Sequence, residues 1–569
     1  MKKLAKSILL VGVIGLTTSL TYAQTQSRGE VTDQEFVIRK DRVLTVPVQP
    51  RVFERLPVLP QPKGLTDFNY MVNKYPLTLP PLVLETTPIQ KPFRAPQLDL
   101  YPGFLRVGYG NFASPLLEAR YMATEAEQVN YSINLGHQSF GKGPVKGEQS
   151  AESHTKFGGD VSYFADLFEV FGGLEWQQDK YSFYGVSPVN FENPDFETSD
   201  NVLNTVKVKA GIRDIEKVGP FSYDAQISYR NFKDSYMAKE NEFGAAATGK
   251  FRPNEDWRGQ VGISYFMTDP EDLNYSKTRT YFAIRPELAY KMGEFRFSAG
   301  LNLVSENDSI ADKSSDFRIF PNLKASYQFA EEFGFFGEFS GDVKRNTYYS
   351  FVSENPYLGP SEQLLNTIQN YKVEGGIEGQ FQEAFHYRAA VNVSRYNNMH
   401  FFVTNFPFPT PGADSTRFSI VYDDKTTVFN INGELGFRFS DIYSMGTRLD
   451  LYQYDLSTQG EAWHKPTWEF RVNNQVTPFQ GLLLQANLNF MGGIKARGYD
   501  LSDIFGQTGP YQVVKLKTIA DLQLKADYQI TNRFAVFAEG NNILNGRNTR
   551  WLNYPVRGIQ LIGGVSMKF

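Results

Sequence analysis

The carboxy-terminal stretch from Tyr511 to Phe569 alternates between apolar and polar residues, and this pattern constrains the fold more than any other feature. A β-strand repeats every two residues, so alternation predicts strands with one apolar and one polar face. From 519 to 530 the apolar face carries Ala520, Leu522, Leu524, Ala526 and Tyr528, and the polar face carries Asp521, Gln523, Lys525 and Asp527. Such strands fit a β-sandwich, or a barrel whose apolar face meets lipid.

The lengths of the connections separate these two folds. Short connections are predicted near 123–128, 166–167, 214–219, 252–256, 292–293, 330–332, 382–384, 440–443, 478–480 and 531–533. Longer polar connections lie between most of them, at 140–153, 181–201, 269–277, 305–315, 345–365, 406–415, 492–510 and 544–554. Up-and-down outer-membrane barrels sort their loops in this way, and a soluble sandwich has no reason to do so. We therefore predict an all-β transmembrane antiparallel barrel of about 22 strands over residues 101–569.

The composition agrees with a barrel and excludes several other classes. Aromatic residues make up 15% of the chain, and the mean hydropathy is −0.38. Barrels place aromatic residues at both membrane interfaces and keep mean hydropathy low by alternation. The net charge of −4 shows no excess of basic residues of the kind that would indicate a nucleic-acid partner. The absence of cysteine excludes disulfides, thiolate metal sites and a lipid-bearing amino-terminal cysteine.

The first residues have the features of a secretory signal peptide. Three lysines precede an apolar run from Ile8 to Leu20, and Thr21-Tyr22-Ala23 offers the small residues that a signal peptidase reads. The run is too short for a helix that crosses a bilayer, which needs about 20 residues. We predict a signal peptide over 1–23, cleaved after Ala23, and export to the outer membrane of a Gram-negative cell.

Residues 24–100 form a separate, proline-rich segment. Twelve of the 30 prolines lie between Pro47 and Pro102. Proline fixes an extended backbone and cannot donate to a strand ladder, while apolar residues recur between the prolines. We predict an extended arm that packs in the barrel lumen or on a periplasmic partner. Glu35, Phe36, Val37 and Ile38 form a stretch that fits strand addition to a partner's sheet; a disordered leader with one adhesive patch is the alternative.

The carboxy-terminal third resembles the outer-membrane TonB-dependent receptor family. The residues that carry the resemblance are Phe537–Asn545, Trp551, Tyr554–Gly558 and Gly563–Phe569, with Pro466–Phe470 of similar character. It implies a 22-strand barrel, a receptor or transport function, and Phe569 as an assembly signal read by the barrel-assembly machinery. The family places a globular plug and a TonB-binding box ahead of the barrel. Here only 77 residues (100 − 24 + 1) lie between the predicted cleavage site and the first strand, so we expect the globular plug to be missing, with Glu35–Ile38 a weak candidate box.

The polar faces of the strands supply candidate lumen-lining residues. These are Lys207, Lys209, Arg213, Asp224, Arg230, Asp521, Lys525 and Asp527. Charges of both signs on a lumen wall form a selectivity lining, or they pair with one another or with whatever fills the bore.

Nothing in the sequence indicates catalysis, a cofactor or a metal. The five histidines, His137, His154, His386, His400 and His464, show no metal-ligand spacing, and we expect them at the surface or in the aromatic girdles. Asp308, Asp312 and Asp316 would suit Ca²⁺, but they lack EF-hand spacing and fit a solvated acidic loop better.

Two functions remain, and neither is enzymatic. In the first, a plugless receptor-like barrel binds or passes a solute. In the second, a non-transporting accessory barrel sits in an outer-membrane complex, and its proline-rich arm docks on a partner such as an envelope lipoprotein or an assembly machine. An outer-membrane hydrolase has little support.

Overall fold

The computed structural model describes residues 101–125, 128–185, 198–215, 219–308, 313–359, 362–382, 384–405, 416–440, 442–499 and 511–569. The predicted signal peptide, the proline-rich arm and the Glu35–Ile38 stretch lie outside the described residues. Asp312 of the acidic loop also lies outside them.

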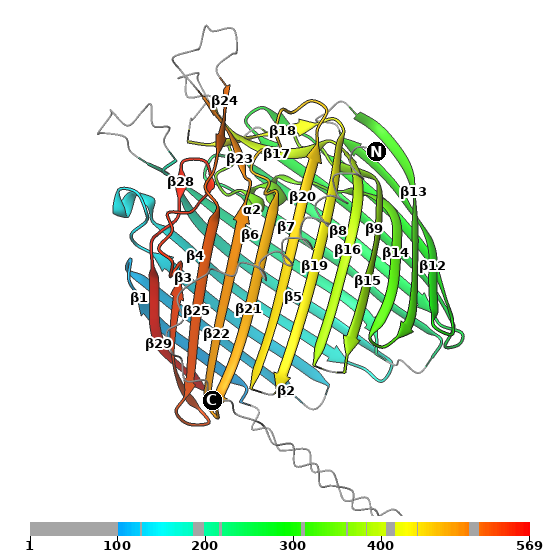
Figure 1. Cartoon of the computed structure of the whole chain (residues 1–569), viewed down its shortest axis with the longest axis horizontal. Coiled ribbons are helices and arrows are strands. Elements are labelled where there is room, and N and C mark those ends of the chain that lie inside the picture. Colours follow the sequence, from blue (N-terminus) through cyan, green and yellow to red (C-terminus); the bar gives the residue numbers. More distant parts are fainter. Residues whose placement is uncertain are drawn as a thin grey trace, which may run out of the picture. The chain divides into compact units, whose positions relative to one another are not determined.

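The described chain forms a closed antiparallel barrel of 22 strands (Figure 1), which confirms the predicted fold. The wall strands are β1 (Gly103–Gly110), β2 (Ser114–Glu125), β3 (Val129–Phe140), β4 (Glu152–Phe164), β5 (Phe168–Phe183), β6 (Ser199–Asp214), β7 (Phe221–Lys233), β8 (Lys239–Phe251), β9 (Trp257–Asp272), β11 (Arg279–Met292), β12 (Phe295–Asp308), β13 (Lys313–Ala330), β14 (Phe333–Lys344), β15 (Thr367–Phe381), β16 (Phe385–Asn397), β19 (Thr426–Ser440), β20 (Tyr443–Asp455), β21 (Trp468–Phe479), β22 (Leu482–Gly492), β25 (Ile519–Gln529), β26 (Phe534–Asn541) and β29 (Gln560–Lys568). Each strand pairs with its neighbour in the chain, and β1 pairs with β29 to close the ring.

The connections at one end carry the remaining elements. These are the 3₁₀ turn η1 (Gly147–Ser150), the helix α2 (Tyr348–Glu354), and the strands β10 (Tyr275–Ser276), β17 (Met399–Thr404), β18 (Phe418–Asp423), β23 (Lys495–Tyr499), β24 (Tyr511–Lys515), β27 (Thr549–Trp551) and β28 (Tyr554–Pro555). Strands β17 and β18, β23 and β24, and β27 and β28 form hairpins outside the wall. Residues 511–515 of the terminal stretch therefore belong to a hairpin and not to the barrel wall.

The connections sort by length as predicted. The end that holds Gly103 and Phe569 has only short turns, such as 293–294, 331–332 and 480–481. The other end, at the top of Figure 1, holds the long connections. Short turns mark the periplasmic side of such barrels and long loops the cell exterior, so we call these ends the inner and the outer end.

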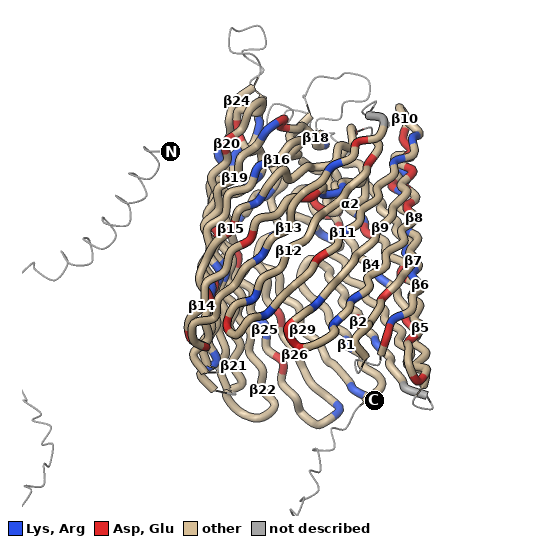
Figure 2. The backbone as a smooth tube through the Cα atoms, turned by 90° about the vertical axis from the view of Figure 1, so that its right-hand side faces the viewer, with Lys and Arg blue, Asp and Glu red and all other residues tan. Residues whose placement is uncertain are grey.

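The two faces of the wall differ in chemistry. Large apolar side chains that share one strand face are exposed on the outside, for example Val208, Leu524 and Val565. Charged residues occur along the full height of the wall (Figure 2), and those that alternate with the apolar residues pair with one another, as Lys207 does with Glu175. An outside of this kind suits acyl chains, and a charged inside suits water.

The seam between β1 and β29 is closed by a close backbone approach at Gly564. Gly564 pairs with Gly108 across the seam. A Cβ atom on Gly564 would lie 2.1 Å from the Val107 carbonyl oxygen and 2.6 Å from the Gly108 Cα. Both are backbone atoms that cannot rotate away, so only glycine permits this spacing.

Replacement of Gly564 by alanine is expected to impair closure, with a loss of folding free energy of about 1–3 kcal/mol from overpacking. The adjacent Gly563→Ala is the matched control, because its nearest contact would be the Phe537 carbonyl oxygen at an ordinary 3.7 Å. The folded fraction, measured by the faster migration of unheated barrels in gels, should fall for Gly564→Ala alone. Equal fractions in the two variants would refute the assignment of strain to the seam.

Candidate functional site

Four long connections fold over the outer mouth of the barrel, and we call them together the outer cap. The cap consists of 345–366 with α2, the β17–β18 hairpin, 456–467, and 542–559 with β27 and β28. Its core and the wall residues beneath it form one buried cluster of Leu203, Phe232, Ala238, Tyr348, Phe351, Val352, Leu358, Leu364, Phe402, Phe418, Trp551 and Tyr554. In both views of the barrel α2 lies within its outline (Figures 1 and 2). The cap therefore has an apolar core of its own inside the mouth.

Aromatic contacts join parts of the cap that begin on distant strands. Tyr357, which follows α2, stacks on Tyr554 of β28 with ring centroids 3.6 Å apart. Tyr348 of α2 packs on Phe232 of β7, with centroids 5.8 Å apart. A solute that enters from outside along this part of the mouth must displace these contacts.

His464 holds three segments of the cap together. Its Nδ1 donates to the carbonyl of Phe402 (2.8 Å), and its Nε2 accepts a hydrogen bond from the amide of Leu552 (3.3 Å). Arg550 donates to the carbonyl of His464 (2.6 Å). Burial lowers the pKa of His464 to about 3, so the ring stays neutral and retains its acceptor near neutral pH.

Asp423 fastens the β17–β18 hairpin to the 456–467 connection. Its carboxylate accepts hydrogen bonds from the backbone amides of Ser457 (3.0 Å), Thr458 (2.7 Å) and Gln459 (2.9 Å). Burial opposes ionisation of Asp423, but these donors outweigh it and hold its pKa below the usual range. The ionised carboxylate of Asp423, hydrogen-bonded to three backbone amides, therefore holds the hairpin to this connection.

An ion pair and a buried histidine join α2 to its neighbours. Glu354 contacts Lys465 Nζ (2.7 Å) and His400 Nε2 (2.8 Å) with its two carboxylate oxygens. The exposed fraction of the residue is 5% for His400 and 1% for His464. The expectation of surface or girdle histidines is therefore wrong for these two residues, because the long connections fold into the mouth and not away from it.

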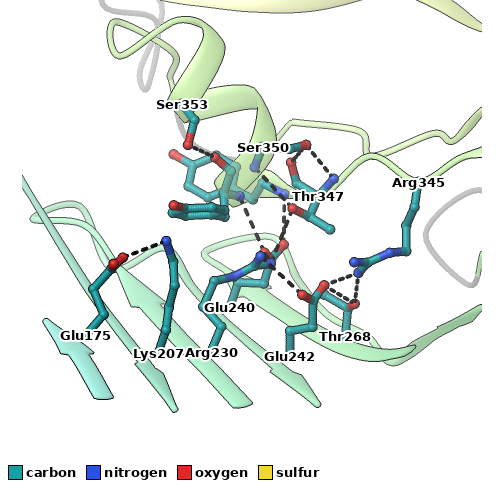
Figure 3. A network of polar contacts seen from close by, with 12 residues as sticks. Glu175, Lys207, Arg230, Glu240, Glu242, Thr268, Arg345, Thr347, Ser350 and Ser353 are labelled. Carbon is teal, nitrogen blue, oxygen red and sulfur yellow. Dashed lines mark hydrogen bonds and ion pairs between the residues drawn. The ribbon is translucent and has the colours of Figure 1, made fainter. Parts of the chain in front are cut away.

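A polar network anchors α2 on the lumen-facing side of the barrel wall (Figure 3). Glu240 on β8 is fully buried and accepts a hydrogen bond from the amide of Tyr348 (2.8 Å). Arg230 on β7 contacts Glu240 (2.9 Å) and Glu242 (3.1 Å), and Arg345 pairs with Glu242 from above. The first turn of α2 is therefore attached to the wall by a carboxylate that has no contact with solvent.

Glu362 gives the cap a dependence on pH. The side chain is 8% exposed and accepts a hydrogen bond from the amide of Ile420 (2.9 Å). Burial raises its pKa to about 7, and the charge of Asp272 adds to the effect. The folded cap therefore binds more protons than the unfolded chain between pH 4.5 and 7, and its stability falls as the pH rises through that window.

Replacement of Glu362 by glutamine is expected to remove the loss of cap stability that occurs as the pH rises. The pKa difference of about 2.5 units corresponds to about 3 kcal/mol of cap stability at pH 8, and none below pH 4.5. Hydrogen exchange of the Ile420 amide, corrected for the intrinsic pH effect, should then be slower in the variant at pH 8 and equal at pH 4.5. Equal protection of wild type and variant at both pH values would contradict the prediction.

The predicted lumen-lining residues lie on the charged face of the wall, where most of them pair within the wall. Lys207 pairs with Glu175 (3.0 Å), Lys209 with Asp160 (2.9 Å), Arg213 with Glu169 (2.5 Å), and Lys525 with Glu539 (3.3 Å) and Asp527 (3.8 Å). Asp224 stands opposite Arg213 across β6 and β7. Asp521 accepts a hydrogen bond from Gln523 (3.0 Å). Their role in selectivity stays a prediction.

Among the described residues, recesses lie below the cap on the lumen-facing side of the wall. One of about 540 Å³ lies on β2–β8 and includes Lys156 and Lys207. One of about 420 Å³ includes Arg258 and Lys324, and one of about 890 Å³ near the inner end includes Arg388 and Glu434. The inner wall therefore offers charged space of the size that small-molecule sites occupy.

Alternation in the sequence missed several residues that organise this site. Arg106 on β1 pairs with Glu539 on β26 and lies 3.7 Å from the centroid of the Phe537 ring. Glu240 and His464 also matter only through partners distant in sequence. The strand pattern indicates that Arg106 and Glu240 face inward, but it carries no signal for what they meet. His464 lies in a loop, where no pattern applies.

The described residues give no sign of a metal centre, since no group of three or more of their His, Asp and Glu side chains is arranged so that it could hold a metal ion. Within the same residues, no helix is long and apolar enough to cross a membrane.

No protein-family model matches the sequence, and no match is found among curated proteins. Solved structures do match the barrel. The FrpB iron transporter from Neisseria meningitidis aligns with a TM-score of 0.66 over 83% of this chain and 82% of its own, at 12% identity. The fold is that of the outer-membrane TonB-dependent receptors.

Two further TonB-dependent receptor barrels give the same result. The ferric enterobactin receptor PfeA from Pseudomonas aeruginosa has a TM-score of 0.61 at 13% identity, over 82% of this chain and 81% of its own. The siderophore receptor PirA from Acinetobacter baumannii also has a TM-score of 0.61, at 10% identity, over 82% and 80%. The resemblance inferred from the carboxy-terminal motifs is confirmed at the level of the barrel fold.

Proposed function

We propose that the protein is a plugless outer-membrane receptor or transport barrel for a solute, and that its own outer cap controls entry to the bore. The observation that carries the proposal is the set of charged recesses that remain in the inner wall below the cap. Solved structures with the same fold are named as an iron transporter and as siderophore receptors, which supports a receptor over an enzyme. The charged bore would give a solute a water-filled path, and the cap would close that path at the outer mouth.

The proposal includes a cellular route and partners. A signal peptide removed after Ala23 would deliver the chain to the periplasm, and the barrel-assembly machinery would read Phe569 and insert the barrel into outer-membrane lipid. Glu35–Ile38 would meet a TonB-type partner or an envelope lipoprotein at the inner end. Strand addition of this short stretch to a partner's sheet edge is the mode that its composition favours.

Conductance in planar bilayers tests the transport function. The full chain, a variant with residues 30–100 deleted, and a variant with a loosened cap are compared under the same conditions. Transport predicts a closed wild type and an open, ion-conducting state when the cap is loosened. A barrel that stays closed in all three forms contradicts it.

The second candidate is a non-transporting accessory barrel in a larger outer-membrane complex. The buried aromatic core of the cap favours it, because a mouth sealed by an apolar cluster suits a permanently closed cylinder. Stoichiometric co-purification with another envelope protein, lost when residues 30–100 are deleted, together with no conductance in any form, would establish this alternative.

A further inference from the structure

The recess on β2–β8 has more cations than carboxylates. Of the residues that line its 540 Å³, Arg120, Lys156, Lys207, Lys209 and Arg230 are basic, and Asp160, Glu175 and Glu242 are acidic. Arg230 also meets Glu240, and Glu242 also meets Arg345. Including these two outer partners leaves six cations against four carboxylates, so the excess of two positive charges remains.

The excess can be assigned to particular groups. Glu175 is shared by two lysines, at 2.8 Å from Lys156 Nζ and 3.0 Å from Lys207 Nζ. One carboxylate cannot neutralise two ammonium groups, so this trio has a net positive charge. The carboxylate of Asp160, in contrast, has Lys209 as its single cationic partner at 2.9 Å.

Arg120 supplies the second positive charge. It lies on β2 opposite Asn134 of β3, and its side chain is exposed to the bore. No described residue offers it an ion pair or a hydrogen bond. Arginine presents a planar fork of donors that matches the two oxygens of a carboxylate or phosphate.

The recess also has a roof and neutral donors. The ring centroid of Tyr349 in α2 lies 5.2 Å from Lys207 Nζ and 4.3 Å from the Arg230 guanidinium carbon, so the cap covers one side of the recess. Asn134, Gln226 and Ser228 line the recess and can donate hydrogen bonds. Cations, amides and a hydroxyl around one space are the groups that bind an oxyanion.

We propose that this recess, below the outer cap, binds a small polyanion that bears carboxylate or phosphate groups. The inference rests on the proposed receptor function and names the class of solute for it. The ligand would take its bidentate contact from Arg120 and its second charge contact from the Lys156–Glu175–Lys207 trio. A ligand bound below α2 would connect occupancy of the bore to the seating of the cap.

Binding to the purified full-length protein in detergent tests the site without any requirement for transport. Isothermal titration is carried out with citrate, with inorganic phosphate and with glucose. We expect citrate, phosphate or both to bind, glucose not to bind, and the affinity to fall as ionic strength rises. Heat from citrate alone identifies a carboxylate site, and heat from phosphate alone a phosphate site; no heat from either overturns the proposal.

Two variants with opposite expected signs separate a binding role from a structural one. Arg120→Gln should weaken binding about tenfold, in line with the loss of a charged hydrogen-bond donor. Glu175→Gln should strengthen binding, because it releases two lysines. A merely structural disturbance would weaken binding in both.

Lys372→Gln is the matched control. Lys372 lies on the opposite part of the wall and contacts two carboxylates, Glu374 at 2.8 Å and Glu338 at 3.4 Å. Its replacement should leave the affinity unchanged, and an equal loss in Lys372→Gln and Arg120→Gln would overturn the proposal. If the protein binds the anion but does not conduct ions in any form, the proposed transport function is wrong, and the proposed binding site still holds.

Discussion

Replacement of Glu240 by alanine is expected to detach α2 from the barrel wall and to open the outer cap. Glu240 is fully buried and holds the Tyr348 amide and the guanidinium of Arg230. Its removal leaves a largely buried cation with one carboxylate fewer and an amide without its acceptor. Loss of one partner from a buried ion pair costs about 3–5 kcal/mol, which is comparable with the whole stability of a small structural unit.

The absence of native cysteine makes a direct measurement possible. Ser228 lines the recess below the cap, so Ser228→Cys introduces one unique thiol in the bore. A bulky, membrane-impermeant maleimide added to intact cells should label this thiol slowly in the parent and at least tenfold faster with Glu240→Ala. Glu338→Ala is the control, because Glu338 is partly exposed and contacts Lys372 at 3.4 Å. Equal labelling in all backgrounds would show that α2 does not close the mouth.

Replacement of Trp551 by alanine is expected to disrupt the apolar core of the cap. The indole is 8% exposed, and its ring centroid lies 5.3 Å from that of Phe402 and 5.6 Å from that of Phe418. Truncation of a buried tryptophan costs about 3–5 kcal/mol, through lost transfer free energy and the cavity left behind. The cap should then unfold locally while the hydrogen-bonded wall remains intact.

Limited proteolysis from outside measures this effect, with cleavage in the connection 542–559 as the readout. Trp257→Ala is the control, because Trp257 is 40% exposed on the outer face of β9 and contacts Tyr290 with the two rings tilted. We expect rapid cleavage and ion conductance for Trp551→Ala and neither for Trp257→Ala. A protease-resistant, closed Trp551→Ala barrel would show that the cap does not depend on its aromatic core.

The barrel follows from the sequence because its physical cause is local. A strand that separates lipid from water must alternate at every second residue, and each turn at the inner end must be short, so the evidence lies within windows of about ten residues. The pattern at Ile519–Gln529 indicated which face meets lipid, and Leu524 and Tyr528 are indeed exposed. Strand number followed from the same rule, because each connection marks one reversal.

The candidate site could not be predicted in the same way, because its contacts are non-local. Glu240 and Tyr348 are 108 positions apart, and His464 and Leu552 are 88 apart. Long polar connections read as solvated loops, and nothing in their composition indicated that Phe402, Phe418 and Trp551 would pack together inside the mouth. The histidine expectation failed for this reason. Of the recess residues, Lys207, Lys209 and Arg230 were predicted from the sequence, as inward charges without assigned partners.

The uneven lengths of the wall strands have a mechanical consequence. The strands at the seam are short, with 8 residues in β1, 8 in β26 and 9 in β29, whereas β5 has 16 and β13 has 18. Fewer ladder hydrogen bonds hold the seam than hold the opposite side. Under tension or heat the cylinder should therefore unzip first between β1 and β29, and during insertion this junction should be the last to lock.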